Sequence, residues 1–290
     1  MESPTGLIRG FVVVQFMIAN LVAADATFEV PSALGQWEFV RAPNYGELIP
    51  RINNDACGNT YYACNAAITP RSSDTDFITA CDEIVDICLV LSFLTARCVA
   101  PTGAIGEITF IATGDTFIRP RAIVGFGELQ VRSLTALFSN WLTTSYTTYR
   151  QRHLRLQLSH WLSGLTCFSL EDIYLSVSVQ MDIIKQREIA AMSSNFTFFQ
   201  GMVSASTNYG LTPLGQDFKN MRNDIVHEGV LSGTNFPSKS KSDCSSVAAS
   251  TLNWIDQYII SVLSVASHIS YSPRWNGPAL QHGLPAHTVR

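Results

Sequence analysis

The sequence predicts an α+β protein, in which a mixed α/β domain over residues 1–125 precedes an all-α helical bundle over residues 126–272. Two observations predict this division. Short apolar runs rich in Val, Phe and Ile, separated by Pro and Gly, dominate the first part and are typical of strands. From residue 128 onward, apolar residues recur at helical spacing in long segments joined by polar loops. The Pro- and Gly-rich end, residues 273–290, is expected to form an irregular tail.

The first domain is expected to begin with three short strands. The segments "GFVVVQFMIA", "ATFEV" and "GQWEFV" combine branched and aromatic residues, and Pro31 and Gly35 separate them. The next segment, residues 53–73, is turn-rich at its start. Because Ser73 precedes Asp76 by three residues, the pair can satisfy free amide groups, and a helix is expected to follow.

That helix, "DFITACDEIVDICLVLSFLTARCV", carries its acids in its first half and is apolar almost all round in its second. The pattern indicates a helix that is exposed at one end and buried at the other. The next segment, residues 106–124, alternates around Gly114 and Asp115, which predicts a hairpin.

The second domain is expected to consist of helices with no strands between them. A first helix is predicted from Glu128, where apolar residues of "ELQVRSLTALFSNWLTTSY" follow helical spacing. The segments "LRLQLSHWLSGL" and "LEDIYLSVSVQMDIIKQREIAAM" predict two more. Thr212 and Pro213 are good first residues for a helix over "LGQDFKNMRNDIVHE", with Leu214, Phe218, Met221 and Ile225 as its core stripe. A last helix is expected to bury Leu252, Ile255, Ile259 and Val262.

The amino terminus allows two interpretations. Arg9 precedes an apolar run, residues 10–26, that resembles a signal peptide. However, Glu2 precedes this run, Gln15 and Asn20 interrupt it, and it falls short of the ~20 residues that a membrane span requires. We therefore favour a buried strand and a cytoplasmic protein without membrane association. The alternative is a secreted or envelope protein whose first 24 residues are cleaved, with a glycan at the Asn195 sequon.

Charge and cysteine content narrow the function. A net charge of −4 argues against a protein that coats nucleic acid with a broad basic face, although it allows an enzyme that meets RNA in one local cleft. The seven cysteines include no C-x-x-C pair and no zinc-like spacing with histidine. We interpret them as reduced thiols of a cytosolic protein, and we expect no metal site and no cofactor.

The stretch "MRNDIVHEG", residues 221–229, gathers the polar groups that suit phosphodiester chemistry. On a helix Arg222 and His227 lie roughly 140° apart around the axis, whereas Asn223 and His227 share a face. Arg222 is long enough to curl its guanidinium toward that face. Histidine moves protons near neutral pH, and arginine holds a phosphate and stabilises the negative charge of the transition state. The helix is expected to stop at Gly229.

This stretch resembles the signature of the HEPN superfamily: an arginine, a polar residue, three further positions and a histidine near the end of a bundle helix. Residues 128–270 are similar to the HEPN helical bundle in helix count and motif placement. The resemblance implies a metal-independent endoribonuclease of anti-phage defence or toxin systems, in which two subunits form one composite cleft. It also implies 2′-hydroxyl attack on the adjacent phosphate, with His227 as general acid/base, Arg222 as phosphate clamp and Asn223 as orienting group.

The resemblance has one informative departure. HEPN toxins that pair with a nucleotidyltransferase antitoxin carry a tyrosine two residues after the histidine, where this chain has Gly229. That subtype is therefore disfavoured. The front half looks like that of larger two-domain HEPN defence proteins of the ApeA type, which implies a sensor or substrate-binding role for residues 1–125.

Other polar residues allow a functional and a structural interpretation. Asp224 is a candidate for substrate contact, but a solvated acid is the simpler expectation. Arg150, Arg152 and Arg155 could guide an RNA backbone, or they could form an exposed helix face. The motif itself could merely cap a helix end. The competing function is therefore a non-catalytic HEPN protein that binds RNA or nucleotides, or a scaffold with a regulatory protein partner.

Overall fold

The structure, a computed structural model, describes residues 14–53, 57–69, 71–95, 97–105, 129–141, 145–164, 169–192 and 196–281. The chain divides into two compact units. Within the described residues, the first unit contains residues 14–105 and 133–141, and the second contains residues 129–132 and 145–281, with the gaps given above. An α+β chain with a helical carboxyl-terminal part was predicted, and the structure confirms it.

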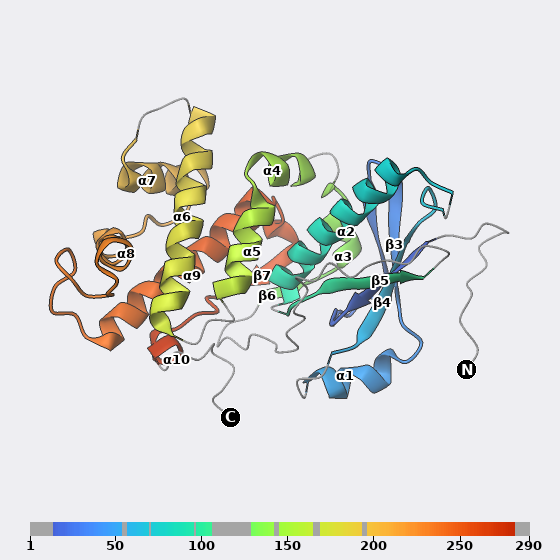
Figure 1. Cartoon of the computed structure of the whole chain (residues 1–290), viewed down its shortest axis with the longest axis horizontal. Coiled ribbons are helices and arrows are strands. Elements are labelled where there is room, and N and C mark those ends of the chain that lie inside the picture. Colours follow the sequence, from blue (N-terminus) through green and yellow to red (C-terminus); the bar gives the residue numbers. More distant parts are fainter. Residues whose placement is uncertain are drawn as a thin grey trace. The chain divides into compact units, whose positions relative to one another are not determined.

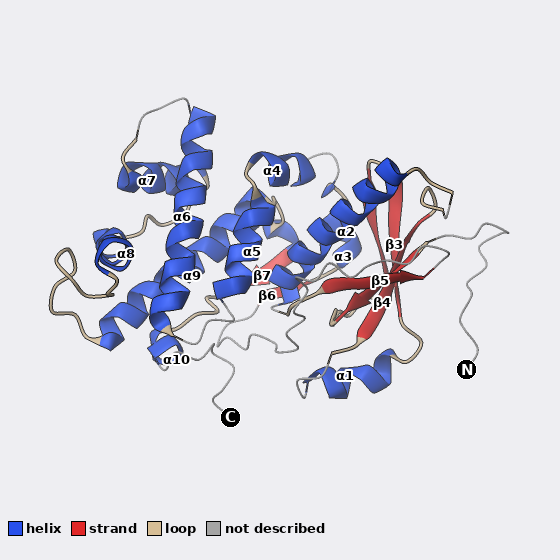
Figure 2. Ribbon diagram, in the orientation of Figure 1, coloured by secondary structure: helices blue, strands red, loops and turns tan. Residues whose placement is uncertain are grey.

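An antiparallel sheet forms the centre of the first unit (Figure 2). It has five strands in the order β2-β3-β4-β1-β5. Its strands are β1 (Gln15–Ala19), β2 (Thr27–Ser32), β3 (Gly35–Arg41), β4 (Asn59–Asn65) and β5 (Ala100–Ile105). Alternate side chains, among them Phe16, Phe28, Trp37, Phe39 and Tyr61, are fully or almost fully buried. The strands predicted around β1, β2 and β3 are confirmed, because their alternation of apolar and polar residues matches the period of a strand.

The helix α2 (Asp74–Thr95) packs on this sheet (Figure 1). Phe77 of α2 stacks on Phe16 of β1. Its predicted start is confirmed. Ser73 Oγ accepts a hydrogen bond from the amide of Asp76 at 3.2 Å and donates to its carboxylate at 2.7 Å. The short helix α1 (Tyr45–Asn53) was not predicted, and neither was β4. The hairpin expected around Gly114 lies outside the described residues.

The long helix predicted from Glu128 is wrong. Residues Leu129–Val131 form the strand β6, which pairs antiparallel with β7 (Ile269–Tyr271) in the second unit. The helix α3 (Leu134–Phe138) is short and belongs to the first unit, where Phe138 stacks near Phe28. The expectation of a bundle without strands is corrected by the β6–β7 ladder, whose partners lie far apart in sequence.

The second unit is otherwise helical (Figure 1). Its helices are α4 (Tyr146–Gln151), α5 (Leu154–Gly164), α6 (Leu170–Met192), α7 (Phe198–Asn208), α8 (Gln216–Glu228), α9 (Lys241–Val262), the 3₁₀ helix η2 (Ala266–His268) and α10 (Gly277–Gln281). The predicted helices α5, α6 and α9 are confirmed. The helix α7 was not predicted, although Thr197 and Gln200 form a capping box at its start.

Two further expectations are corrected. The helix α8 begins at Gln216 with Gly215 as its N-cap, so Thr212 and Pro213 precede it. The tail is not irregular throughout, because Arg274 and Trp275 are buried and α10 follows them. Among the described residues no helix is long and apolar enough to cross a membrane, and the cysteines that the structure describes are free thiols.

Candidate functional site

The helix α8 presents the predicted motif on a well-anchored element. Phe218, Met221 and Ile225 of α8 are buried at helical spacing. The hydroxyl of Tyr174 on α6 donates to the carbonyl of Phe218 at 2.9 Å, which fixes α8 against α6. The helix ends at Gly229, as predicted. Its φ of 74° lies in the left-handed region, where glycine is favoured as the residue after a helix.

Arg222 is held from three sides. Its Nη2 donates to Oδ2 of Asp182 on α6 at 2.5 Å, and its Nη1 donates to Oδ1 of Asn223 at 3.2 Å. Its guanidinium carbon lies 4.9 Å from the centre of the Phe198 ring on α7, a distance typical of a cation–π contact. The contact with Asn223 brings the guanidinium to one of the two residues, Asn223 and His227, toward whose shared face it was expected to curl. The side chain is 16% exposed.

His227 is exposed in the last turn of α8. Among the residues that the structure describes, no hydrogen bond or ion pair joins His227 to Arg222 or to Asn223. One chain therefore brings Arg222 and Asn223 together and leaves the imidazole open to solvent.

Asp224 is not a solvated acid, and that interpretation is wrong. It is fully buried, and its carboxylate accepts hydrogen bonds from the amides of Gly233, Asn235 and Phe236 and from the side chain of Asn235 at 2.6 to 2.9 Å. Burial disfavours the charge, but these hydrogen bonds outweigh it and hold the pKa of Asp224 below its usual value. The occupied carboxylate ties the loop after α8 to the helix, so substrate contact by Asp224 is not supported.

The arginines near α4 divide between two environments. Arg152 lies 3.4 Å from the buried carboxylate of Glu188 and donates to the carbonyl of Arg187, so the expected exposed helix face does not include it. Arg150 is exposed, with its guanidinium near the Tyr146 ring, and Arg155 is partly exposed. Arg152 therefore makes its contacts within the fold, and of these three arginines only Arg150 and Arg155 can reach a ligand from the surface.

Glu188 centres a buried polar network that was not predicted. The hydroxyls of Tyr258 and Tyr209 donate to its Oε1 at 2.8 and 3.3 Å. Burial, followed by the charge of Glu188, raises the pKa of Tyr258, and the same causes raise that of Tyr209. One sequence signal could have found this residue. Glu188 stands four residues after the buried Ile184, at a position of α6 where an apolar side chain is expected.

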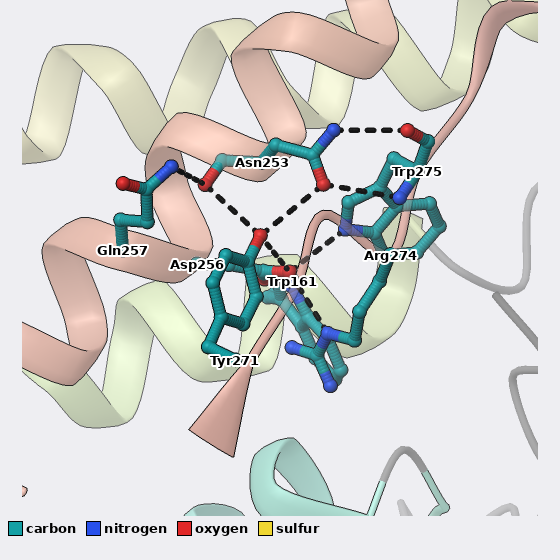
Figure 3. Close-up of polar contacts among 7 residues, drawn as sticks. All are labelled: Trp161, Asn253, Asp256, Gln257, Tyr271, Arg274 and Trp275. Atoms are coloured by element: carbon teal, nitrogen blue, oxygen red, sulfur yellow. Dashed lines mark hydrogen bonds and ion pairs between the residues drawn. The ribbon is translucent and has the colours of Figure 1, made fainter. Parts of the chain in front are cut away.

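A second buried network surrounds Asp256 of α9 (Figure 3). Its Oδ1 accepts from the indole of Trp161 at 3.0 Å, and its Oδ2 accepts from Nε of Arg274 at 2.9 Å and from the indole of Trp275 at 3.0 Å. Asn253 adds a reciprocal pair of bonds to the backbone of Trp275. Asp256 follows the buried Leu252 by four residues, so here too a charged residue stands on a helix face where an apolar side chain is expected. These contacts attach the segment after β7 to α9.

No protein-family model, curated protein or solved structure matches this chain. Among the described residues, no group of three or more His, Cys, Asp or Glu side chains is arranged to hold a metal ion. The chemistry of the α8 site is that of a permanent cation anchored beside an amide, with an exposed imidazole one turn further along the helix.

Proposed function

We propose that this chain is a metal-independent endoribonuclease of the HEPN type. In this mechanism the ribose 2′-hydroxyl loses its proton and attacks the adjacent phosphorus, and the bond from phosphorus to the 5′-oxygen of the next nucleotide breaks. One product ends in a 2′,3′-cyclic phosphate, and the other, after protonation of the leaving oxygen, ends in a 5′-hydroxyl. His227 transfers the protons, Arg222 binds the phosphate and stabilises its charge, and Asn223 orients the reacting groups. The observation that carries the proposal is the anchoring of Arg222 beside Asn223, one turn before an exposed histidine at the end of the same helix.

The proposed active form is a homodimer. Arg222 and His227 make no polar contact within the described part of one chain, so a composite cleft between two copies would complete the site. Exposed apolar side chains support this proposal. Val226 and Val230 are 40% and 42% exposed around the end of α8, and Leu175 and Val179 on α6 are 44% and 39% exposed. A second copy related by twofold symmetry would cover such residues.

The proposed setting is anti-phage defence or a toxin role in the cytoplasm, under the control of a regulatory protein partner. RNA is the proposed substrate, with Arg150 and Arg155 as backbone contacts outside the centre. The net charge of −4 supports a local site over a broad nucleic-acid face.

The test is cleavage of total RNA, with and without EDTA, by the full chain and by His227→Ala and Arg222→Ala. We expect cleavage to persist in EDTA and to leave 2′,3′-cyclic phosphate ends. Loss of the proton donor lowers the rate by about 10² to 10⁴, and loss of the guanidinium by about 10² to 10³. His268→Ala on η2 and Arg132→Ala, directly after β6, are the matched controls. Full activity in both motif variants removes the mechanism.

A non-catalytic RNA- or nucleotide-binding scaffold is the second candidate. The observation that favours it is the ion pair with Asp182, which neutralises the motif arginine in the single chain. The same preparation decides between the two. A scaffold binds labelled RNA without turnover, and His227→Ala leaves its affinity unchanged.

A further inference from the structure

Asp182 contacts the motif arginine from a different helix. It lies on α6, 40 residues before Arg222, and its Oδ2 is 2.5 Å from the Nη2 of that residue. The two partners differ in exposure, because the Asp182 side chain is 42% exposed and the Arg222 side chain is 16% exposed. The carboxylate therefore reaches the guanidinium from the solvent side of α6.

The contacts of Arg222 leave part of its guanidinium unused. Each terminal nitrogen of a guanidinium carries two N–H groups, and Nε carries one. Asn223 takes one N–H of Nη1, and Asp182 takes one N–H of Nη2. The Nε atom is buried and has no hydrogen-bond partner among the described residues. One N–H thus remains on each terminal nitrogen, and each of them can donate to a phosphate oxygen.

The geometry favours a directing role for Asp182 over a purely structural one. An ion pair with a partner this exposed contributes little to folding, because water competes with both charges. The pair nevertheless determines where the terminal nitrogens point, since Phe198 holds only the flat face of the guanidinium. Asn223 lies next to Arg222 on α8, so among the described residues Asp182 is the hydrogen-bond partner that ties the cation to another helix.

We propose that Asp182 is a positioning residue for Arg222, which holds the guanidinium so that its remaining terminal N–H groups meet the phosphate of the RNA substrate. The proposal deepens the proposed nuclease function and rests on it for the identity of the ligand. It differs from a role as competing counter-ion, in which the phosphate would have to displace Asp182 before binding.

The first test needs no RNA. In the full chain labelled with ¹⁵N, the Nε–H of Arg222 should give a resolved NMR signal, because this atom is buried and protected from exchange. Arg222→Lys assigns the signal by its disappearance. We expect Asp182→Asn to broaden or shift it strongly, while Asp217→Asn, an equal charge change at the start of α8, leaves it in place. An unchanged signal in Asp182→Asn overturns the proposal, whether or not the protein cuts RNA.

The second test divides binding from turnover. With RNA in excess, we expect kcat to fall about tenfold in Asp182→Asn, which keeps an oxygen acceptor, and about 100-fold in Asp182→Ala, since small displacements of a catalytic group cost this much. KM should stay within about threefold in both. A lower KM with an unchanged kcat overturns positioning and identifies a competing counter-ion.

The two proposals fail separately. If the unaltered chain does not cut RNA, the proposed function fails. The NMR comparison, repeated with inorganic phosphate as the probe, then still decides whether Asp182 holds Arg222. If the chain cuts RNA and Asp182→Ala matches it in kcat, the positioning role fails and the nuclease stands.

Discussion

Two arginine–carboxylate pairs of the helical unit have similar contacts and different surroundings. Arg274 and Asp256 meet at 2.9 Å with side chains that are 4% and 0% exposed. Arg222 and Asp182 meet at 2.5 Å with side chains that are 16% and 42% exposed. Around the first pair, indole N–H groups use the remaining acceptor capacity of Asp256. In the second pair, the carboxylate of Asp182 on α6 stays partly exposed to solvent.

The comparison distinguishes Arg274, which stabilises the fold, from Arg222, which is available to bind a ligand. A buried charge must keep its partner, because an uncompensated ion in the interior costs several kcal/mol. A surface pair costs little to exchange, because water and other ions can replace either partner. Arg152 belongs with the first kind, since it faces the almost fully buried Glu188. Burial of the acid, rather than the contact distance, therefore distinguishes these arginines.

The largest effect is expected from breaking the buried pair. Asp256→Ala should lower the free energy of unfolding by about 3 to 5 kcal/mol, because Arg274 and the indole groups of Trp161 and Trp275 lose their acceptor in the interior. Urea denaturation followed by circular dichroism measures this difference, with Asp217→Ala as an exposed control. A loss below about 1 kcal/mol, within the range of a surface pair, would contradict the assignment of Asp256 as a structural centre.

A smaller and pH-dependent effect is expected at Asp224. Asp224→Asn should cost about 1 to 3 kcal/mol at pH 7, because an amide presents a donor where backbone N–H groups need an acceptor. The pKa of Asp224 is lowered in the folded chain, so its contribution is complete above the unfolded value of about 3.9 and is lost as the pH falls through the folded pKa.

The difference between the unaltered chain and Asp224→Asn should therefore shrink between pH 5 and pH 3, which are round values about one unit on either side of the unfolded pKa. Urea denaturation at these two values checks the sign. Glu228→Gln is the matched control, because Glu228 accepts from the amide of Thr234 in the same loop but is exposed. An equal difference at both pH values means that the carboxylate of Asp224 does not stabilise the loop through its charge.

Local signals in the sequence, such as a regular apolar period or a capping pair, predicted several elements. The helix α6 carries buried apolar residues at helical spacing from Leu170 to Ile184, and the start of α2 follows from Ser73 and Asp76, three residues apart. The strand β6 could not be predicted in this way, because its partner β7 lies far along the chain. Leu134 and Leu137 have the same apolar spacing whether they belong to a long helix or to the short α3, so periodicity alone could not exclude the wrong helix.

The candidate site shows the same limit. The contact between Arg222 and Asn223 joins neighbours in sequence. The length of the arginine side chain predicted only that the guanidinium could curl toward the face that Asn223 shares with His227. Asp182 lies 40 residues from its partner, so no spacing rule connects them. The burial of Asp224 depends on the loop that closes over it, and the motif pattern contains no information on that closure. The sequence motif thus identified the cation, but it did not identify Asp182, which holds the cation, or the loop that buries the neighbouring Asp224.

The smallest effect on stability, and the sharpest contrast with Asp256, is expected at Asp182. Asp182→Asn should change the free energy of unfolding by no more than about 1 kcal/mol, because its carboxylate is partly solvated in the folded chain. The effect should shrink further in about 1 M salt, because salt screens an ion pair with a solvent-exposed partner, while the loss in Asp256→Ala persists. Paired urea titrations at low and high salt measure both. If Asp182→Asn instead destabilised the chain as much as Asp256→Ala at both salt concentrations, Asp182 would be a structural anchor. Any loss of RNA turnover in that variant would then follow from unfolding rather than from a misplaced guanidinium.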